Sequence, residues 1–250
     1  MLKSMAGRLL GRAGYSIVRR SQRESDMEPE FLDLYRRCRA YTMTSLERMY
    51  ALYGATAYLA RNGIPGDVVE CGVWRGGSSM LAAMTLARLG AADRCLYLYD
   101  TFAGMTEPTS LDTDHRGRSA RDLWRRAPTD GARRWFHAPV DEVRRNMALT
   151  GYPAERIVYV VGKVEETIPA TVPERIALLR LDTDWFESTY HEMVHLLPRL
   201  AAGGVLVLDD YGHWQGARRA IDRYFEEAGI RPFLQRIDYT GRMAVNTWTR

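Results

Sequence analysis

Short apolar runs and amphipathic stretches alternate along the chain from residue 67 onward. The apolar runs have the length of buried strands, and the stretches between them carry apolar residues at spacings of three and four, which predicts helices. We expect strands at residues 67–71, 94–100, 157–161, 176–182 and 205–209, and helices at residues 78–89, 141–149, 189–200 and 216–228. This alternation predicts an α/β protein with a doubly wound, mostly parallel sheet.

The two ends of the chain have different patterns. Residues 30–62 have helical spacing that is interrupted at residues 41–45, where Ser45, or Thr44 with Glu47 after it, fits a helix N-cap. Residues 233–248 alternate between apolar and polar positions, which predicts a β-hairpin. We therefore expect extra N-terminal helices over residues 1–62 and one main domain over residues 63–250.

A long polar stretch interrupts the alternation at residues 103–135. It contains Gly104, Pro108, Gly117, Pro128 and Gly131, which favour loop structure. Long loops inside compact domains commonly have a function. We therefore expect residues 103–135 to act as a lid or substrate loop.

Composition narrows the class of protein. Hydrophobic residues make up 46% of the 250 residues, which is enough for a core, and no apolar run is long enough to span a membrane. The net charge of +4 comes from arginines scattered among acids, so we expect no nucleic-acid partner. The three cysteines are too dispersed for a disulfide framework or a zinc site, which favours the reducing cytoplasm.

The basic, mildly amphipathic segment at residues 1–24 allows two interpretations. Arg8 and Arg12 interrupt its apolar residues, so it does not resemble a signal peptide. A helix of this kind packs against its own domain or a second subunit, or it makes peripheral contact with an anionic membrane surface.

A glycine-containing turn follows the first expected strand. Gly72, Gly76 and Gly77 remove side chains and so allow close approach to a bound molecule, and the helix that begins near Ser78 points its amides the same way. The spacing fits neither a dinucleotide fingerprint nor a phosphate loop. Turns of this kind also occur for purely structural reasons.

An acidic residue, Asp100, ends the second expected strand and is followed by Thr101 and Phe102. Nucleoside-binding sheets use an acid at this position to accept hydrogen bonds from two ribose hydroxyls. A cap for the following loop is the structural alternative.

More acids follow two later strands. Asp182 and Asp184 come at the end of one, and Asp209 and Asp210 at the end of another. Parallel strands end at one edge of the sheet, where these carboxylates would repel each other unless a cation compensates them. Oxygen ligands without His or Cys indicate Mg²⁺, or Mn²⁺ or Ca²⁺ in its place. The alternative is that these acids cap helices and face water.

Taken together, the motifs resemble a known family. Between about residues 41 and 225 the chain contains, in order, VECGVWRGGSS, YDTFAGM, GKVEETIP, LLRLDTDWFEST and GGVLVLDDYGHWQGARRAID. These segments resemble the macrocin O-methyltransferase family, which includes sugar O-methyltransferases that act on macrolide and aminocoumarin antibiotics. The resemblance implies a class I, Rossmann-like fold that binds S-adenosylmethionine (SAM) and a divalent metal, usually Mg²⁺.

The resemblance also implies roles for individual residues. Glu70, Gly72 and the following turn with Gly76, Gly77 and Ser78 would hold the methionine part of SAM. Thr42, Met43 and Thr44 would close over the cofactor. Asp100, with Thr101 and Phe102, would hold the ribose, and Val164 and Glu165 would lie along the adenine. Asp182, Asp209 and Asp210 would bind the metal, with Asp182 also at the cofactor.

The chemistry that follows is methyl transfer to a sugar hydroxyl. Asp182 is the first candidate for the proton acceptor and Asp184 the second, and Tyr211 and His213 are candidate substrate contacts. The expected acceptor is a glycoside, glycan or glycolipid with vicinal hydroxyls, and the expected assembly is a homodimer. One alternative is a catechol-type enzyme, but those carry a lysine where this chain has Trp185. A SAM-binding protein without turnover is the other.

Overall fold

The computed structural model describes residues 24–126 and 135–248. The basic segment at residues 1–24 therefore lies outside the described residues except for Glu24, as does part of the polar stretch, residues 127–134. Contacts divide the chain into one unit at Met1–Asp33 and a second at Leu34–Arg250. The boundary predicted at residue 62 falls inside the second unit.

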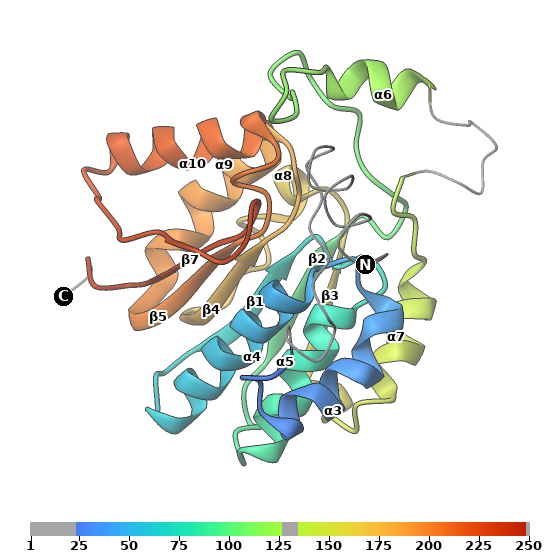
Figure 1. The fold of residues 1–250 in the computed structure, drawn as a ribbon, viewed down its shortest axis with the longest axis vertical. Coiled ribbons are helices and arrows are strands. Elements are labelled where there is room, and N and C mark those ends of the chain that lie inside the picture. The colour runs from blue at the N-terminus through green and yellow to red at the C-terminus, as the bar shows by residue number, and fades with distance from the viewer. Residues whose placement is uncertain (1–23, 127–134, 249–250) are drawn as a thin grey trace, which may run out of the picture. The chain divides into compact units, whose positions relative to one another are not determined.

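A sheet of seven strands runs through the second unit in the order β3-β2-β1-β4-β5-β7-β6 (Figure 1). Neighbours among the first five strands along the chain pair in parallel, whereas β7 pairs antiparallel with both β5 and β6. The doubly wound, mostly parallel sheet is thereby confirmed. The strands are β1 (Asp67–Cys71), β2 (Leu96–Asp100), β3 (Ile157–Val161), β4 (Ile176–Leu181), β5 (Leu200–Leu208), β6 (Gln235–Arg236) and β7 (Arg242–Val245).

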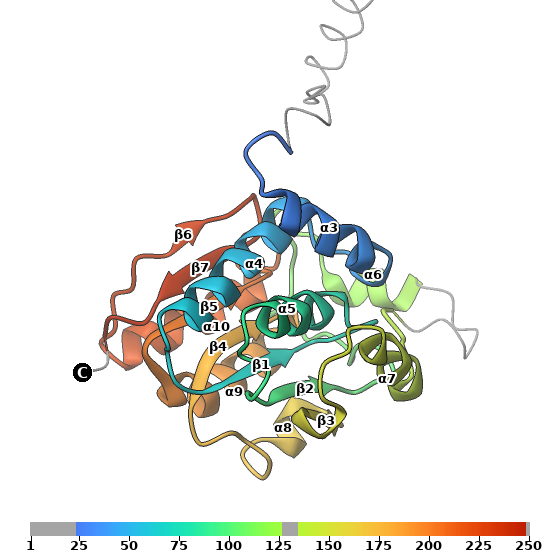
Figure 2. The same ribbon diagram turned by 90° about the horizontal axis from the view of Figure 1, so that it is seen from below.

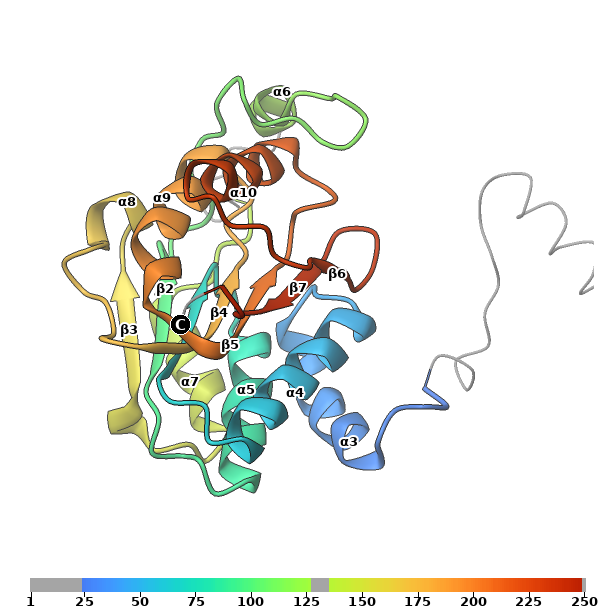
Figure 3. The same ribbon diagram turned by 90° about the vertical axis from the view of Figure 1, so that its left-hand side faces the viewer.

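Helices cover both faces of this sheet. Helices α4, α5 and α7 lie on one face, and α8, α9 and α10 lie on the other (Figure 3). The helices are α3 (Pro29–Cys38), α4 (Leu46–Arg61), α5 (Gly77–Arg88), α6 (Ala120–Arg126), α7 (Val140–Ala148), α8 (Val164–Thr167), α9 (Phe186–Leu196) and α10 (Gln215–Glu227). None of the helices that the structure describes is both long and apolar enough to span a membrane.

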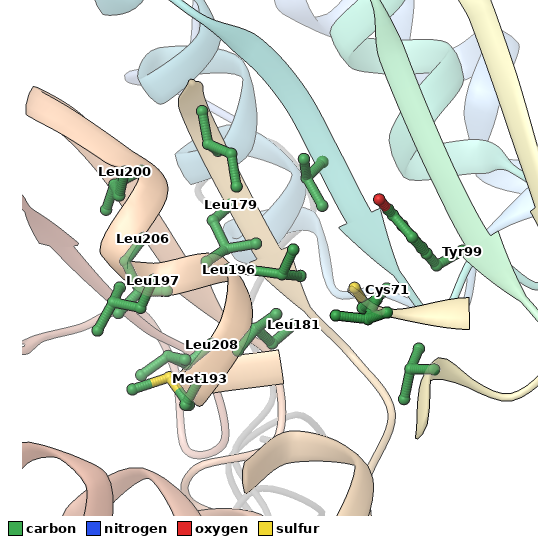
Figure 4. Packing of buried hydrophobic residues seen from close by; sticks show 14 of the residues in the cluster. Cys71, Tyr99, Leu179, Leu181, Met193, Leu196, Leu197, Leu200, Leu206 and Leu208 are labelled. Atoms are coloured by element: carbon green, nitrogen blue, oxygen red, sulfur yellow. The ribbon is translucent and has the colours of Figure 1, made fainter. Parts of the chain in front are cut away.

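The central strands are buried on both faces, as their nearly continuous apolar sequences require. All residues of β4 are buried, and Leu179 and Leu181 pack against α9 through Met193 and Leu196 (Figure 4). Full burial of each such side chain stabilises the fold by about 1.5–3 kcal/mol. The charged exception in this strand, Arg180, lies at the base of the functional site.

The N-cap of α4 is Ser45, one of the two residues that the sequence indicated. Its hydroxyl accepts a hydrogen bond from the amide of Arg48. The hydroxyl of Thr44 instead accepts a hydrogen bond from Arg180 at 3.1 Å. Ser45 therefore fixes the start of α4, and Thr44 is turned toward the carboxyl edge of the sheet.

Part of the polar stretch after β2 is firmly attached to the domain. Asp112 is fully buried, and its Oδ1 accepts a hydrogen bond from the amide of Phe186 at 2.8 Å, at the start of α9. The carbonyl of Thr113 accepts one from the amide of Gln215 at 2.8 Å, at the start of α10. This long-range cap places the start of α9 at Phe186, before the predicted residue 189.

Candidate active site

A cleft of about 700 Å³ lies at the carboxyl ends of the central strands. Most of the residues that the sequence singled out line it: Thr42, Met43, Thr44, Gly72, Ser78, Asp100, Thr101, Val164, Glu165, Asp182, Asp184, Asp209, Asp210 and His213. Glu70, Gly76, Gly77, Phe102 and Tyr211 are described by the structure but lie outside this lining. The sheet edge therefore gathers groups that are far apart in the sequence.

The turn after β1 is held in place by Asp100 at the end of β2. One carboxylate oxygen of Asp100 accepts hydrogen bonds from the amides of Val73 and Trp74 at 2.8 and 2.9 Å, and the other accepts one from Phe102 at 2.8 Å. Burial raises the pKa of Asp100, and these amides act against that rise. Asp100 thus fixes the shape of the glycine-containing turn after β1, called below the cofactor turn, and it also lines the cleft.

Two glycines of this turn serve backbone packing. Gly72 has a φ of 86°, and a Cβ there would collide with the carbonyl of Asp182, so glycine lets the ends of β1 and β4 meet. A Cβ on Gly77 would lie 2.7 Å from both the carbonyl oxygen of Tyr41 and the Cβ of Thr42. The absence of side chains here brings residues 42–44, called below the covering segment, against the start of α5.

A buried arginine that the sequence analysis did not select forms the floor of the cleft. Arg180 is 2% exposed, and its Nη1 lies 2.5 Å from Oε1 of Glu70. Its Nη2 lies 2.7 Å from Oδ2 of Asp182 and 2.7 Å from Oδ1 of Asp209. The signal for it was a lone charge inside the apolar run Ile176–Leu181.

Glu70 supports this floor. Ser79 donates to one carboxylate oxygen of Glu70 and Arg180 donates to the other. Burial raises the pKa of Glu70, and the charge of Arg180 opposes that rise. The structure therefore places Glu70 outside the lining of the cleft, where its carboxylate balances the charge of Arg180.

Three carboxylates meet above this floor. One oxygen from each of Asp182, Asp184 and Asp210 lies within 4.8 Å of the others. Oδ2 of Asp210 is buried, and no hydrogen-bond donor in the described part of the chain reaches it. Burial raises the pKa of Asp184 to about 7, and burial together with the charges of Asp184 and Asp182 raises the pKa of Asp210 well above its usual value. Of the three carboxylates, Asp182 also pairs with Arg180 in the floor of the cleft.

Asp209 is not part of this cluster. Its carboxylate is ion-paired with Arg180, and also with Arg48 from α4. Two of the three acids predicted to bind metal, Asp182 and Asp210, are therefore brought together, but Asp184 takes the third position. Asp209 lines the cleft, and the two arginines compensate its buried charge.

The two predicted substrate contacts lie in different places. His213 lines the cleft, and burial together with the nearby His115 lowers its pKa. Tyr211 points to α10, where its hydroxyl donates to Oδ1 of Asp222 at 2.6 Å. The structure therefore brings His213, but not Tyr211, to the site.

Strand pairing orders the groups across the cleft. Asp100 ends β2, Gly72 follows β1, and the acidic residues follow β4 and β5. Gly162, Val164 and Glu165, which follow β3, line the end of the cleft beyond β2. The groups expected at the cofactor thus follow β3, β2 and β1, and the carboxylate cluster follows the neighbouring strands β4 and β5.

Comparison with known proteins decides what this arrangement is. Residues 9–245 match the family model described as Macrocin-O-methyltransferase (TylF). The chain belongs to the macrocin O-methyltransferase family. The protein is therefore an O-methyltransferase, and the family resemblance inferred from the sequence motifs is confirmed.

Two relatives and two solved structures show how far the similarity extends. The chain is 32% identical over 218 residues, 87% of this chain and 80% of the relative, to 8-demethyl-8-(2,3-dimethoxy-alpha-L-rhamnosyl)-tetracenomycin-C 4'-O-methyltransferase of Streptomyces olivaceus. It is 31% identical over 208 residues, 81% and 77% of the two chains, to mycinamicin III 3''-O-methyltransferase of Micromonospora griseorubida. The structure of the O-methyltransferase NovP matches with a TM-score of 0.71 and 27% identity, and the match covers 83% of this chain and 82% of NovP.

The fold is that of class I SAM-dependent methyltransferases. An O-methyltransferase from Bacillus cereus in complex with SAH has the same fold, with a TM-score of 0.54, 13% identity and coverage of 90% and 95% of the two chains. For this O-methyltransferase, family and fold make SAM the methyl donor. Residues Gly72 to Ser78 and Asp100 are then at the expected end of the sheet for its cofactor.

Proposed function

We propose that this O-methyltransferase transfers the methyl group of SAM to a hydroxyl of a sugar, and that a divalent cation held by aspartates assists the transfer. The observation that carries the proposal is the cluster of Asp182, Asp184 and Asp210 next to the cofactor turn. The names of the two relatives, which act on a rhamnosyl-tetracenomycin and on mycinamicin III, support a sugar-bearing acceptor.

The chain's own residues fit a divalent cation. The cluster offers three carboxylate oxygens without His or Cys, which suits Mg²⁺. The buried Oδ2 of Asp210 has a free ligand position, and the raised pKa of Asp184 reflects a site that disfavours negative charge until a cation arrives. When bound, such a cation lowers the pKa of a hydroxyl that reaches it.

Asp184 is the proton acceptor that the geometry favours over Asp182. One oxygen of Asp182 already pairs with Arg180 at 2.7 Å, which lowers its readiness to take a proton. Asp184 has a φ of 67°, in the left-handed region that few residues other than glycine adopt, and it lines the cleft. We assign proton transfer from the acceptor hydroxyl to a carboxylate oxygen of Asp184.

The catechol-type alternative has less support. Trp185 occupies the position of the lysine in those enzymes, and it is buried with its Nε1 donating to the carbonyl of Thr106 at 3.0 Å. The side chain therefore packs against Thr106 and offers no base. A SAM-binding protein without turnover would have no use for the crowded carboxylates.

The remaining predictions concern surroundings and partners. We propose a cytoplasmic homodimer without nucleic-acid partners, and a membrane contact through residues 1–24 stays a prediction. Sedimentation of the full chain tests the dimer. Flotation with anionic vesicles tests the membrane contact, and protein that stays at the bottom of the gradient contradicts it.

The experiment for the proposed function uses the full chain with labelled SAM. A panel of glycosides with vicinal hydroxyls is compared with free catechols, with Mg²⁺ and with chelator. We expect methylated glycosides only when metal is present, and a loss of about 10²–10⁴-fold in kcat for Asp184→Asn. Asp222→Asn, a carboxylate that pairs with Tyr211 away from the cleft, is the control. Chelator-resistant turnover would contradict the metal, and turnover of catechols alone would contradict the sugar.

A further inference from the structure

The order of the strands indicates from which side the methyl acceptor enters. The cofactor groups follow β3, β2 and β1, and the carboxylate cluster follows β4 and β5. An acceptor that meets the methyl group at the cluster must therefore lie toward the next strand, β7. The turn between β6 and β7 closes that side and runs beside α4 (Figure 2).

Tyr239 projects from this turn into the cleft. It lines the cleft and is 55% exposed, unusually open for a large aromatic residue. Its hydroxyl lies 3.1 Å from Nδ1 of His213, and its ring centroid lies 6.0 Å from that of His115. The amide of His213 in turn donates to the carbonyl of Asp210 at 2.9 Å. The polar tip and the ring of Tyr239 are thus linked directly to the loop that carries a cluster aspartate.

Asp238 fixes this turn in two directions. Its Oδ1 accepts hydrogen bonds from the amides of Thr240 and Gly241 at 2.9 and 2.7 Å, which shape the turn. Its Oδ2 accepts from the hydroxyl of Ser45 at 2.7 Å and from Nε of Arg48 at 3.1 Å. Because Ser45 directly follows the covering segment, Asp238 connects the cover of the cofactor to the wall on the acceptor side.

On the basis of the proposed function, we propose that Tyr239 is a specificity-determining residue that contacts the acceptor sugar, and that Asp238 is the positioning residue that holds it relative to the covering segment. A phenol both donates and accepts hydrogen bonds, which suits a sugar hydroxyl, and its ring is a rigid apolar surface for the C–H face of a pyranose. The wall that Tyr239 forms with His213 is therefore chemically matched to a carbohydrate.

Steady-state kinetics on the glycoside panel, together with calorimetric titration of S-adenosylhomocysteine, test this assignment. For Tyr239→Ala we expect an acceptor KM about 10-fold higher and a changed order of preference among glycosides, with cofactor affinity unchanged, since one lost hydrogen bond and its ring contact account for that factor. Tyr190→Phe is the matched control, because that hydroxyl pairs with Glu227 on the far side of α9.

Asp238→Asn separates the two functions of the carboxylate. The remaining amide oxygen keeps an acceptor for the turn, whereas the charge that faces Arg48 is lost. We expect a higher acceptor KM and weaker binding of S-adenosylhomocysteine together, a pattern that a merely local turn defect would not produce. If Asp238→Asn does not fold, Tyr239→Ala carries the test alone.

The outcomes distinguish this inference from the proposed function. If the wild type methylates a glycoside and Tyr239→Ala has the same acceptor KM and the same order of preference, the sugar contact alone is overturned. Unchanged cofactor affinity in a folded Asp238→Asn overturns its positioning role. A wild-type chain that methylates catechols and no glycoside overturns the proposed function and the sugar contact with it.

Discussion

Nη2 of Arg180 lies 2.7 Å from Oδ1 of Asp209, at the floor of the cleft. The same guanidinium reaches Glu70 and Asp182, so one buried cation is shared by three acids. This sharing divides the acidic residues at the sheet edge into two groups. Asp209 is compensated by arginines of the chain itself, whereas Asp184 and Asp210 belong to the carboxylate cluster that, under the proposed function, would bind a cation from solution.

Replacement of Arg180 tests whether the floor depends on this charge. Arg180→Met keeps most of the volume but leaves buried carboxylates unpaired, so we expect the free energy of unfolding to fall by about 3–5 kcal/mol. Urea unfolding measures it. Arg223→Met, which removes a solvent-screened surface pair with Glu227, should lower the free energy of unfolding far less than Arg180→Met does. Equal losses in both variants would contradict a special role for Arg180.

The division among the acids predicts different metal binding for two adjacent aspartates. Asp210→Asn should abolish saturable binding of Mn²⁺ in calorimetry, because it removes the oxygen that no protein donor satisfies. Asp209→Asn should keep the binding, because its carboxylate already pairs with Arg48 and Arg180. Loss of binding in both variants would restore the ligand set expected from the sequence, with Asp209 in place of Asp184, and retained binding in Asp210→Asn would contradict both sets.

The pKa of Asp184 predicts how stability depends on pH without metal. Burial raises this pKa from 3.8 to about 7, so the folded chain binds the proton more tightly than the unfolded chain does. Stability contributed by the protonated group is complete below pH 3.8 and is lost as the pH rises toward about 7.

Thermal unfolding in chelator measures this dependence. We expect the Tm of the metal-free protein to fall across that pH range more steeply than the Tm of Asp184→Asn. Addition of Mg²⁺ should raise the Tm most at the high-pH end, where the carboxylates are ionised. Identical pH profiles for the wild type and Asp184→Asn would show that the carboxyl of Asp184 does not titrate in this pH range.

Local pattern was sufficient for the strands and for the acids at their ends. The doubly wound, mostly parallel sheet follows from alternating strands and helices, and Asp182 and Asp210 meet because parallel strands end at one edge. The charged residue in the apolar run at β4 was also visible in the sequence, since a buried charge requires partners. Its partners could have been sought among the acids of neighbouring strands.

Long-range side-chain pairing was not predictable in the same way. Arg48 meets Asp238 across 190 positions of sequence, and no periodicity links the start of α4 to the turn before β7. The same limit explains Tyr211, whose spacing placed it at the site although its hydroxyl pairs with Asp222. It also explains why the ion pairs of Asp209 with two arginines were not expected. Single-sequence reasoning locates the edge of a sheet, but not the direction in which each side chain points.

Gly216, near the start of α10, reports on how the polar stretch is attached. A Cβ at this position would collide with Oδ1 of Asp112 and lie 3.1 Å from the amide of Phe186. Gly216→Ala should therefore break the cap that holds residues 109–119 at the start of α9. We expect a loss of about 1–3 kcal/mol in stability, as for other overpacked sites, and a higher acceptor KM.

Gly54→Ala in α4 is the matched control for this substitution. Nothing in the described chain lies within 4 Å of a Cβ at Gly54, so helix propensity alone should act there and stabilise the fold by about 0.5–1 kcal/mol. Opposite signs for the two glycines in urea unfolding would show that Gly216 is required by Asp112 and not by the helix. If Gly216→Ala also stabilises the protein, residues 109–119 are free to move away from α9, and attachment by Asp112 is not what positions them over the cleft.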